Sequence, residues 1–523
     1  MKNKLKILII ITLLASLFTV SSVKSDSKPF GEYKYIFKVN QDGVNNITII
    51  YEAWRNGDSW LLLPKNFTKY EIKVLDGEII HEKLEKAYTS QGDEYVFYSN
   101  YTFQYRANGK FMMKITYTMK YGSIIVEPQC FFYSPQIYFK SEDRGVVEIH
   151  LPRNIKIGEN KIIPPPAGIE EKGEEYVIKI NLSQNIARIA IEYTTENPYN
   201  PITMRRGIFT VETPRRYREL AERILETYNL FYENLTKIFS VNLTDIRVIF
   251  YAPKLEDLWT GGYVPFNGKN LGKIHLNLIY VRTLKGYWEQ IALHELVHHF
   301  VYAAGITPDL LWFHEGMAEY VSITLTTQIG WSGQLSRKSD LEATAQTLYP
   351  NYGFIQDWKP GRKDENIGKY YAAAYAVVKA LADENGGLEF YRKFFQEIKD
   401  LKNVTTTEIL IHYLSKAAGR DLTNEFKEWN FRIIGVENIS QIIVEGRNIV
   451  KMKGLLGVPW SLIADEILNL ADEALKNGRT NMAMMEAYMG IMIAQYSLTL
   501  TTITICIVML ILIGRIKIEE LYG

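Results

Sequence analysis

The chain carries a long apolar run near each of its ends. At the N-terminus, three lysines among the first six residues precede the apolar run Ile7–Val20, and small residues follow it. This order is typical of a signal peptide, which we expect at residues 1–25. The alternative is a membrane anchor that is not cleaved. In either case the bulk of the chain is exported.

At the other end, the segment Ile493–Ile513 contains no charged residue. A run of this length can cross a bilayer as one helix. Arg515 and Lys517 follow at once, and positive charge prefers the cytoplasmic side of a membrane. We therefore expect a single-pass protein of the cell membrane, with a transmembrane helix at Ile493–Ile513, a cytoplasmic tail at 514–523 and the bulk of the chain outside the cell. A buried core helix is the alternative.

Residues 26–200 alternate apolar and polar positions in short runs that are rich in β-branched and aromatic residues. The runs are Tyr33–Val39, Asn46–Ala53, Lys69–Leu75, Phe111–Met119, Val146–Leu151, Tyr176–Asn181 and Ala187–Tyr193. Turn signals such as Asn108-Gly109 separate them. Many short strands without intervening helices predict an antiparallel β sandwich. We find no catalytic constellation in it.

The pattern changes after Asn197–Pro201, which has the composition of a linker. Thr213 followed by Pro214 predicts the N-cap and the first residue of a helix, and apolar residues at helical spacing follow them. Two strands are expected next, at Ile246–Tyr251 and Ile274–Val281.

The rest of the chain is predicted to be mostly helical. From Tyr287 to about Ile434 the apolar positions keep helical spacing, so we expect a mostly α domain at 206–440. A further amphipathic helix, Leu462–Lys476, lies in a helical juxtamembrane region at 441–490.

Charge and cysteine content narrow the classes of function. The net charge is +1, so no overall field attracts nucleic acid, and we expect no nucleic-acid partner. The only cysteines are Cys130 and Cys506, and the second lies inside the expected membrane helix, so no internal disulfide is expected. Asn-x-Ser/Thr sequons between the two apolar ends offer sites for N-glycans. The sequons are at Asn46, Asn66, Asn100, Asn181, Asn234, Asn242, Asn403 and Asn438.

The segment His294-Glu295-Leu296-Val297-His298 has the HExxH pattern. Residues four apart lie on one face of a helix, so both imidazoles can bind one metal ion. The chain contains 8 histidines, and four of them fall between positions 294 and 314. Because histidine is this rare, chance is a poor explanation for the pattern, which indicates a zinc site.

Two histidines leave a catalytic zinc ion one protein ligand short. Sixteen residues separate His298 from Glu315, enough for a helix end, a turn and a returning helix. Glu319 lies one helical turn after Glu315, on the same face. A zinc-bound histidine usually needs an acceptor on its other ring nitrogen, and we expect Glu319 to be that acceptor for His294. The expected centre is one Zn²⁺ held by His294, His298 and Glu315.

HELVH at 294–298 followed by LWFHEGMAEY at 311–320 resembles the gluzincin metallopeptidases, especially the M1-type aminopeptidases and the related peptidase MA-like proteins. In these families the Glu of the second motif is the third zinc ligand, a position that Glu315 matches. The resemblance covers about residues 206–435 well and 31–200 only by architecture. It implies an α+β multidomain protein in which a β sandwich precedes a mostly α, thermolysin-like catalytic domain.

The segment Tyr370-Tyr371-Ala372-Ala373-Ala374 is similar to an M1 segment in which a Tyr precedes small residues and an apolar helix. There the Tyr hydroxyl donates to the oxyanion of the tetrahedral intermediate. The resemblance implies this role for Tyr371, with Tyr370 as the rival. A tyrosine that only caps a core helix is the alternative.

One departure from the M1 pattern concerns specificity. M1 aminopeptidases carry a Gly-x-Met-Glu-Asn segment whose Glu holds the free amino terminus of the substrate. The corresponding stretch here, Gly261–Gly268, has no carboxylate, and no acidic residue lies between Asp257 and Glu289. We therefore favour an endopeptidase over an aminopeptidase.

These features together predict a zinc metallopeptidase that acts on peptides or proteins. Zinc with three protein ligands keeps an open position for water and lowers the pKa of that water. Glu295 would take the proton and deliver it to the leaving amine, and the strand Ile274–Val281 would form the edge of the cleft. The alternatives are a catalytically inactive zinc-binding receptor or adhesion protein on an M1-like scaffold, and a hydrolase of a non-peptide bond.

Overall fold

The computed structural model describes residues 31–522, apart from the short segments 66–68, 89–93, 268–269, 362–365, 402, 434–435 and 478. The predicted signal peptide at 1–25 and the sequon at Asn66 lie outside the described residues. The described chain forms two compact units: one holds residues 31–125 with Phe131–Glu196, and the other holds Val126–Cys130 with the residues from Asn197 onward. The predicted mixture of α and β structure, with several sheets, is confirmed.

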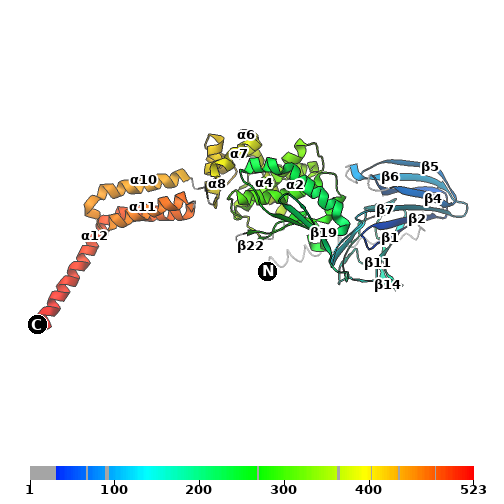
Figure 1. Cartoon of the computed structure of the whole chain (residues 1–523), viewed down its shortest axis with the longest axis horizontal. Helices are drawn as coiled ribbons and strands as arrows, with labels where there is room; N and C mark the ends of the chain where they lie inside the picture. The colour runs from blue at the N-terminus through cyan, green and yellow to red at the C-terminus, as the bar shows by residue number, and fades with distance from the viewer. Residues whose placement is uncertain are drawn as a thin grey trace, which may run out of the picture. The chain divides into compact units, whose positions relative to one another are not determined.

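The first unit contains a seven-stranded sheet with the order β14-β15-β11-β1-β2-β7-β4 (Figure 1). Its strands are β1 (Gly31–Val39), β2 (Asn45–Ala53), β4 (Tyr70–Asp76), β7 (Phe111–Met119), β11 (Arg144–Pro152), β14 (Gly168–Lys172) and β15 (Glu175–Asn181). Buried and more exposed side chains alternate along β1, β2 and β7, because successive residues of a strand point to opposite faces.

The prediction of a wholly antiparallel arrangement is wrong for one pair, because β1 and β11 run parallel. These two strands are far apart in sequence, and no hairpin turn joins them, so nothing local forces them to be antiparallel. The other pairings within this sheet are antiparallel.

A three-stranded sheet, β3-β6-β5, packs against the seven-stranded sheet through aromatic side chains. Its strands are β3 (Gly57–Pro64), β5 (Glu78–Tyr88) and β6 (Glu94–Arg106). The ring centroids of Tyr51 and Phe103 lie 5.2 Å apart, and those of Tyr105 and Phe111 lie 4.4 Å apart. Contacts of this kind join the inner faces of two sheets into one core.

The remaining strands of this region form two smaller sheets. One has the order β12-β17-β9-β8 with β13 also paired to β17, and the other pairs β10 with β16. Their bounds are β8 (Ser123–Val126), β9 (Gln129–Tyr133), β10 (Ile137–Tyr138), β12 (Ile155–Lys156), β13 (Ile162–Ile163), β16 (Ile186–Ala187) and β17 (Ala190–Thr195).

The second unit begins with a five-stranded sheet of order β18-β19-β20-β24-β21. Its strands are β18 (Pro201–Arg206), β19 (Phe209–Pro214), β20 (Ile246–Tyr251), β21 (Gly262–Tyr263) and β24 (Ile274–Asn277), and β22 (Phe266–Asn267) pairs separately with β23 (Asn270–Leu271). The helix α2 (Arg218–Phe239) packs on this sheet and against the helix α3 (Tyr287–Ala303).

The predicted helix start at Thr213 and Pro214 is wrong by a few residues. Both belong to β19, where they pair with β18, and the side chain of Thr213 is fully buried. A 3₁₀ turn, η1 (Arg215–Tyr217), follows before α2 begins at Arg218. The ladder with β18 therefore overrides the capping signal that this dipeptide carries.

The predicted strand Ile274–Val281 is too long, and it does not form a free edge. Asn277 ends β24, because its side-chain oxygen accepts a hydrogen bond from the N–H of Ile279 and starts the 3₁₀ helix η3 (Leu278–Arg282). β24 pairs with β20 on one side and with β21 on the other. The outer strand on the β24 side of this sheet is therefore β21.

The helices that follow α3 build the body of the second unit, as predicted. They are α4 (Leu311–Gln328), α5 (Leu335–Leu348), α6 (Ile367–Asn385), α7 (Leu388–Ile398), α8 (Thr407–Ala418) and α9 (Thr423–Glu428). Short 3₁₀ helices lie at Leu255–Asp257 (η2) and Gly353–Asp357 (η4). α3 and α4 are buried along almost their whole length, so they are core helices rather than surface helices.

The chain ends in three helices, α10 (Val436–Lys453), α11 (Trp460–Lys476) and α12 (Thr480–Tyr522), with the 3₁₀ turn η5 (Gly454–Gly457) between the first two. Figure 1 shows α12 beside α10 and α11 at its start and continuing alone to the C-terminus. Its segment Met482–Ile513 has a mean hydropathy of 2.3 and is long enough to cross a membrane. The predicted membrane helix is thus part of a longer one.

Candidate metal centre

The helix α3 carries the HExxH residues and is anchored firmly at its N-terminal end. Its N-cap, Gly286, has a φ of 96°, and the N–H of Gly286 donates to the carboxylate of Glu289 at 3.1 Å. Arg223 of α2 in turn donates to Glu289 at 2.5 Å. The indole of Trp288 donates to the carbonyl of Asn277 at 3.1 Å, which ties α3 to the end of β24. These bonds fix how far His294 and His298 reach beyond the sheet.

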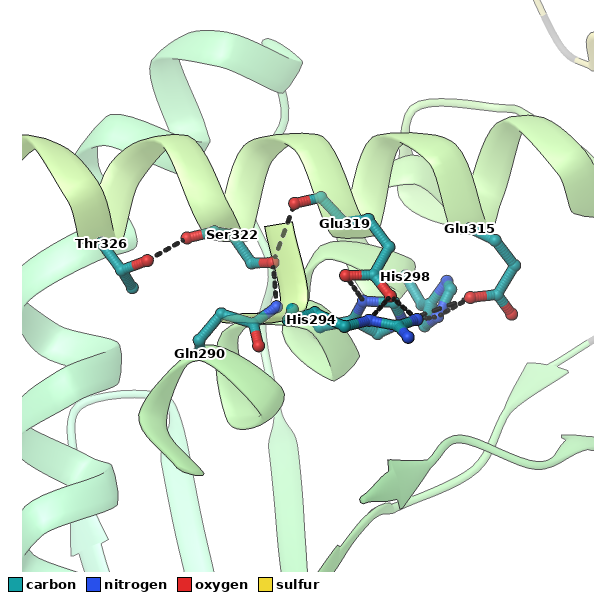
Figure 2. Close-up of polar contacts among 8 residues, drawn as sticks. Gln290, His294, His298, Glu315, Glu319, Ser322 and Thr326 are labelled. Carbon is teal, nitrogen blue, oxygen red and sulfur yellow. Dashed lines mark hydrogen bonds and ion pairs between the residues drawn. The ribbon is translucent and has the colours of Figure 1, made fainter. Parts of the chain in front are cut away.

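The helix α4 returns alongside α3 and brings Glu315 and Glu319 to the two histidines. Figure 2 shows the polar contacts between the two helices, in which Gln290 reaches Ser322. The amide of Gln290 donates to the Ser322 hydroxyl at 2.8 Å, and both side chains are buried. Because an unpaired buried amide is costly, this bond holds the two helices in one register.

Gly316 lies directly after Glu315 because α4 and α6 approach closely there. A Cβ atom at this position would lie 2.6 Å from the carbonyl oxygen of Ala374 and 2.6 Å from a methyl group of Val378. Backbone atoms cannot yield as a flexible side chain can, so only glycine fits. This close packing holds Glu315 against the helix that carries Tyr371.

Three donor atoms converge between α3 and α4. His294 Nε2 lies 3.2 Å from His298 Nε2 and 3.2 Å from Glu315 Oε2, and His298 Nε2 lies 3.5 Å from Glu315 Oε2. Ligands at zinc distances in tetrahedral geometry are separated by about 3.3 Å from one another. The spacing of these atoms therefore fits one zinc-sized ion, and the three residues form the potential metal group of the described chain.

Neighbouring charges and hydrogen bonds shift the pKa values of His294 and Glu315, two of the three donor residues. Burial acts to lower the pKa of His294, but the hydrogen bond to Glu315 and the charges of Glu319 and Glu295 outweigh it and raise the pKa to about 9. Burial acts to raise the pKa of Glu315, but the charge of His298 and the bonds to both histidines hold it well below its usual range. A metal ion must displace the proton of His294, so its affinity should fall as the pH falls.

Glu319 lies where the acceptor for His294 was expected. One of its oxygens, Oε2, is 3.9 Å from His294 Nδ1 and has no hydrogen-bond partner among the described residues. The other oxygen, Oε1, accepts from Arg337 Nε at 3.0 Å and from the Nη2 of the same guanidinium. The unpaired oxygen is therefore the one that faces the histidine, although 3.9 Å is longer than a hydrogen bond.

Glu295 faces a cavity beside the three donors. The cavity has a volume of about 350 Å³, and its walls include Glu295, His294, Tyr371 and the Gly261-Gly262 segment. A Cβ atom on Gly262 would lie 2.9 Å from the carboxylate of Glu295, so β21 can cross this carboxylate only because position 262 is glycine. Burial raises the pKa of Glu295 to about 7, close to the value that suits a general base at neutral pH.

The two tyrosines of α6 lie in different environments. Tyr371 lines the cavity, and burial followed by the charges of Glu315 and Glu295 raises the pKa of its hydroxyl well above the usual value. The hydroxyl thus stays protonated and can donate a hydrogen bond. Tyr370 instead packs on Phe354 and Trp358 at 5.0 and 5.3 Å between ring centroids, and it is not among the residues that line the cavity.

The other histidines near the centre do not join the ligand group. His314 is fully buried, its Nε2 lies 3.2 Å from the carbonyl oxygen of Ile306, and burial lowers its pKa to about 3. Burial likewise lowers the pKa of His299 to about 4. His275 stacks on Tyr263 at 4.3 Å. Among the described residues, the histidines that converge with Glu315 are therefore His294 and His298.

Arg337 is the residue of this site that sequence reasoning missed. It lies on α5, lines the cavity, binds Glu319 and places its guanidinium 5.4 Å from the centre of the Tyr371 ring. One arginine on a polar helix carries no sequence signal of its own. Only the tertiary contacts of α5 reveal that Arg337 reaches both Glu319 and Tyr371.

Aromatic side chains form another part of the cavity wall. Trp259, Tyr280 and Tyr287 line it, and the Trp259 side chain is 82% exposed. Among the described residues, the acidic residues of the lining are Glu295 and Glu319. The described part of the wall therefore offers flat apolar surface and hydroxyl groups, with no further carboxylate.

Comparison with known proteins assigns no function to this chain, so its function must be inferred from its motifs and from the geometry of the site. No protein-family model matches this chain, and no curated protein matches its sequence.

Proposed function

We propose that this protein is a membrane-anchored zinc metallopeptidase that cleaves peptide bonds in the cavity beside His294, His298 and Glu315. One observation carries the proposal: the three donor atoms lie at the mutual distances of zinc ligands, directly beside a buried carboxylate that faces an open cavity. The likeness of HELVH and LWFHEGMAEY to the gluzincin motifs supports the same conclusion, as does the succession of a β-rich unit and a mostly helical one.

Each side chain has a role in this proposal. The zinc ion, when bound, would polarise the substrate carbonyl and lower the pKa of a bound water. Glu295 accepts the proton of the attacking water and passes it to the leaving amine. The hydroxyl of Tyr371 donates a hydrogen bond to the carbonyl oxygen as negative charge develops there. Glu319 orients His294.

The contents of the cavity favour internal peptide bonds over free amino termini. An aminopeptidase must pair the ammonium group of its substrate with a carboxylate, because an unpaired buried charge is costly. The cavity offers Glu295, which serves as the base, and Glu319, which is already bound to Arg337. Among the described residues, no carboxylate of the lining remains for an ammonium group.

We expect a peptide with a blocked amino terminus to be cleaved at least as well as the same peptide with a free one. The measurement is kcat/KM for a matched pair of peptides that differ only in N-terminal acetylation. The zinc site is common to both reactions, so the pair isolates amino-terminal recognition. Strict dependence on the free amino terminus would contradict the endopeptidase proposal and favour an M1-like aminopeptidase.

Arg337→Gln is expected to weaken zinc binding by about 10–100-fold, the usual cost of disturbing a residue behind a metal ligand. The guanidinium holds Glu319 in place, and without it the buried carboxylate can turn away from His294. Competition with a chromogenic chelator measures the affinity without reference to catalysis. Lys338→Gln, which removes the next cation on α5, is the matched control and should bind zinc like the parent.

We also propose that α12 spans the cell membrane once, with the catalytic unit outside the cell and N-glycans on its sequons. The long apolar segment of α12 and the basic residues after it support this arrangement. Peptides or proteins outside the cell would then be the substrates, and nucleic acid would not be a partner.

The full-length protein is expected to remain with membranes during alkaline extraction, whereas a chain that ends at Arg432 should be soluble. The cut is placed ahead of α10 because α10 and α11 share a buried cluster with α12, which includes Ile439, Ala471 and Ala483. Removing α12 alone would expose that cluster. Full-length protein in the aqueous fraction would contradict the membrane anchor.

A further inference from the structure

The loop between α10 and α11 is apolar where a loop in water is usually polar. Between Lys453 and Asp465 the sequence contains no charged residue, and we call this segment, residues 454–464, the hairpin tip. Three of its large apolar side chains point outward, with exposed fractions of 77% for Leu456, 63% for Leu462 and 40% for Ile463. An exposed apolar patch of this kind marks a surface that meets another apolar medium.

The hairpin tip lies beside the first turns of the expected membrane span. Ser497 is buried against Gly457, and the indole of Trp460 donates to the Thr504 hydroxyl at 3.0 Å. Ser497 and Thr504 are two helical turns apart, about 10 Å along α12. The tip therefore runs alongside the segment Ile493–Ile513 rather than above it.

Asp465, the first charged residue of α11, lies beside the part of α12 that precedes the expected span. α11 runs antiparallel to α12, and Ala464 contacts Gly490, while Gly457 contacts Ser497. Asp465 thus lies close to the level at which Ile493–Ile513 begins. The span of 21 residues is about 30 Å long, which equals the thickness of the hydrocarbon layer. The charge-free part of α12 begins at Ala487, directly after Glu486, so the charge-free parts of the hairpin and of α12 begin within about one helical turn of each other.

Polar groups of the hairpin tip are hydrogen-bonded within the protein, as a medium without water requires. Irregular backbone in a membrane must have its polar groups bonded within the protein. The hydroxyl of Thr501 donates to the carbonyl of Gly457 at 3.0 Å and approaches that of Val458 at 3.2 Å. The indole N–H of Trp460 is bonded to Thr504. Hydroxyl groups of α12 thus provide hydrogen-bond partners for polar groups of the tip. In a loop exposed to water, water molecules would provide these partners.

We infer that the hairpin tip, residues 454–464, inserts into the lipid leaflet nearer the catalytic unit, alongside α12. The inference rests on the proposed membrane span of α12. Insertion of about 5–10 Å is the depth at which amphipathic elements lie in a bilayer, and it fits the two turns between Ser497 and Thr504. Lys451 and Lys453, which flank the tip, would lie at the headgroups. The protein would then contact the hydrocarbon layer of the membrane through both α12 and the hairpin tip.

The test uses full-length protein in phosphatidylcholine vesicles and a membrane-impermeant maleimide. The native chain reports on Cys506, which is exposed on α12, because Cys130 is buried. Two further forms carry Cys506→Ser with either Leu456→Cys at the hairpin tip or Asn477→Cys at the far end of α11. Both replaced side chains are exposed, so folding should be unaffected.

The thiol of Leu456→Cys is expected to react at least about tenfold more slowly than that of Asn477→Cys, because an apolar medium suppresses the reactive thiolate. A fluorophore on the same thiol should be quenched by lipids brominated on their acyl chains. Equal reaction at the two positions, with Cys506 still protected, would overturn the hairpin inference and leave the span standing. Reaction of Cys506 as well would overturn both. Protection without quenching would mean that protein covers the tip, which also overturns the inference.

Discussion

Glu295→Gln should bind one zinc ion per chain and lose peptide hydrolysis, with kcat lower by about 10²–10⁴-fold. The substitution removes the proton acceptor but none of the three donor atoms. The amide is nearly the same size as the carboxylate, so the close contact with Gly262 is kept. Single-turnover hydrolysis of a blocked peptide, together with metal analysis of the same sample, measures both consequences.

The pH profile of the parent provides a second check on this role. A protonated carboxyl cannot accept a proton, so kcat should fall as the pH drops through the pKa of the general base. Glu226→Gln, on the exposed face of α2, is a matched control and should behave like the parent. Hydrolysis by Glu295→Gln at the parent rate would show that Glu295 is not the base.

His298→Ala should lose stoichiometric zinc, because it removes one of the three donor residues that converge in the described part of the chain. Zinc binding adds to the stability of the folded state, so the variant should also lose the rise in Tm that added zinc gives the parent. Metal content after dialysis against a weak chelator, followed by thermal unfolding with and without zinc, measures both effects.

The adjacent residue supplies the control for this experiment. His299 is also largely buried, and burial lowers its pKa, but it is not part of the donor group. His299→Ala should keep its zinc even if its Tm falls. Stoichiometric zinc in His298→Ala would remove the proposed ligand set, whatever the activity of the protein.

Local regularities explain why much of the second unit could be predicted. A helix repeats every 3.6 residues, so the spacing of His294 and His298 fixes a shared face before any tertiary contact is known. Glu315 and Glu319 follow the same rule on the returning helix. The apolar segment of α12 depends on composition alone, which is why its position could be predicted but its full extent, Thr480–Tyr522, could not.

The places where prediction failed involve competition between a local signal and a distant partner. The capping signal of Thr213 and Pro214 lost to pairing with β18, and the strand Ile274–Val281 ended early at an Asn277 side chain that caps η3. β21, two residues long, has too little sequence to be recognised, yet it takes the outer edge of the sheet beside Glu295.

The sequence by itself determined which residues are candidate metal ligands, because ligand chemistry and helical spacing are properties of the chain. It also determined which segment of α12 is apolar enough to enter a membrane. Only the tertiary structure decided that Arg337 binds Glu319, that Tyr371 rather than Tyr370 lines the cavity, and that the hairpin tip lies beside Ser497 and Thr504. Each of these depends on contacts between helices that are separate in sequence, and no local pattern encodes them.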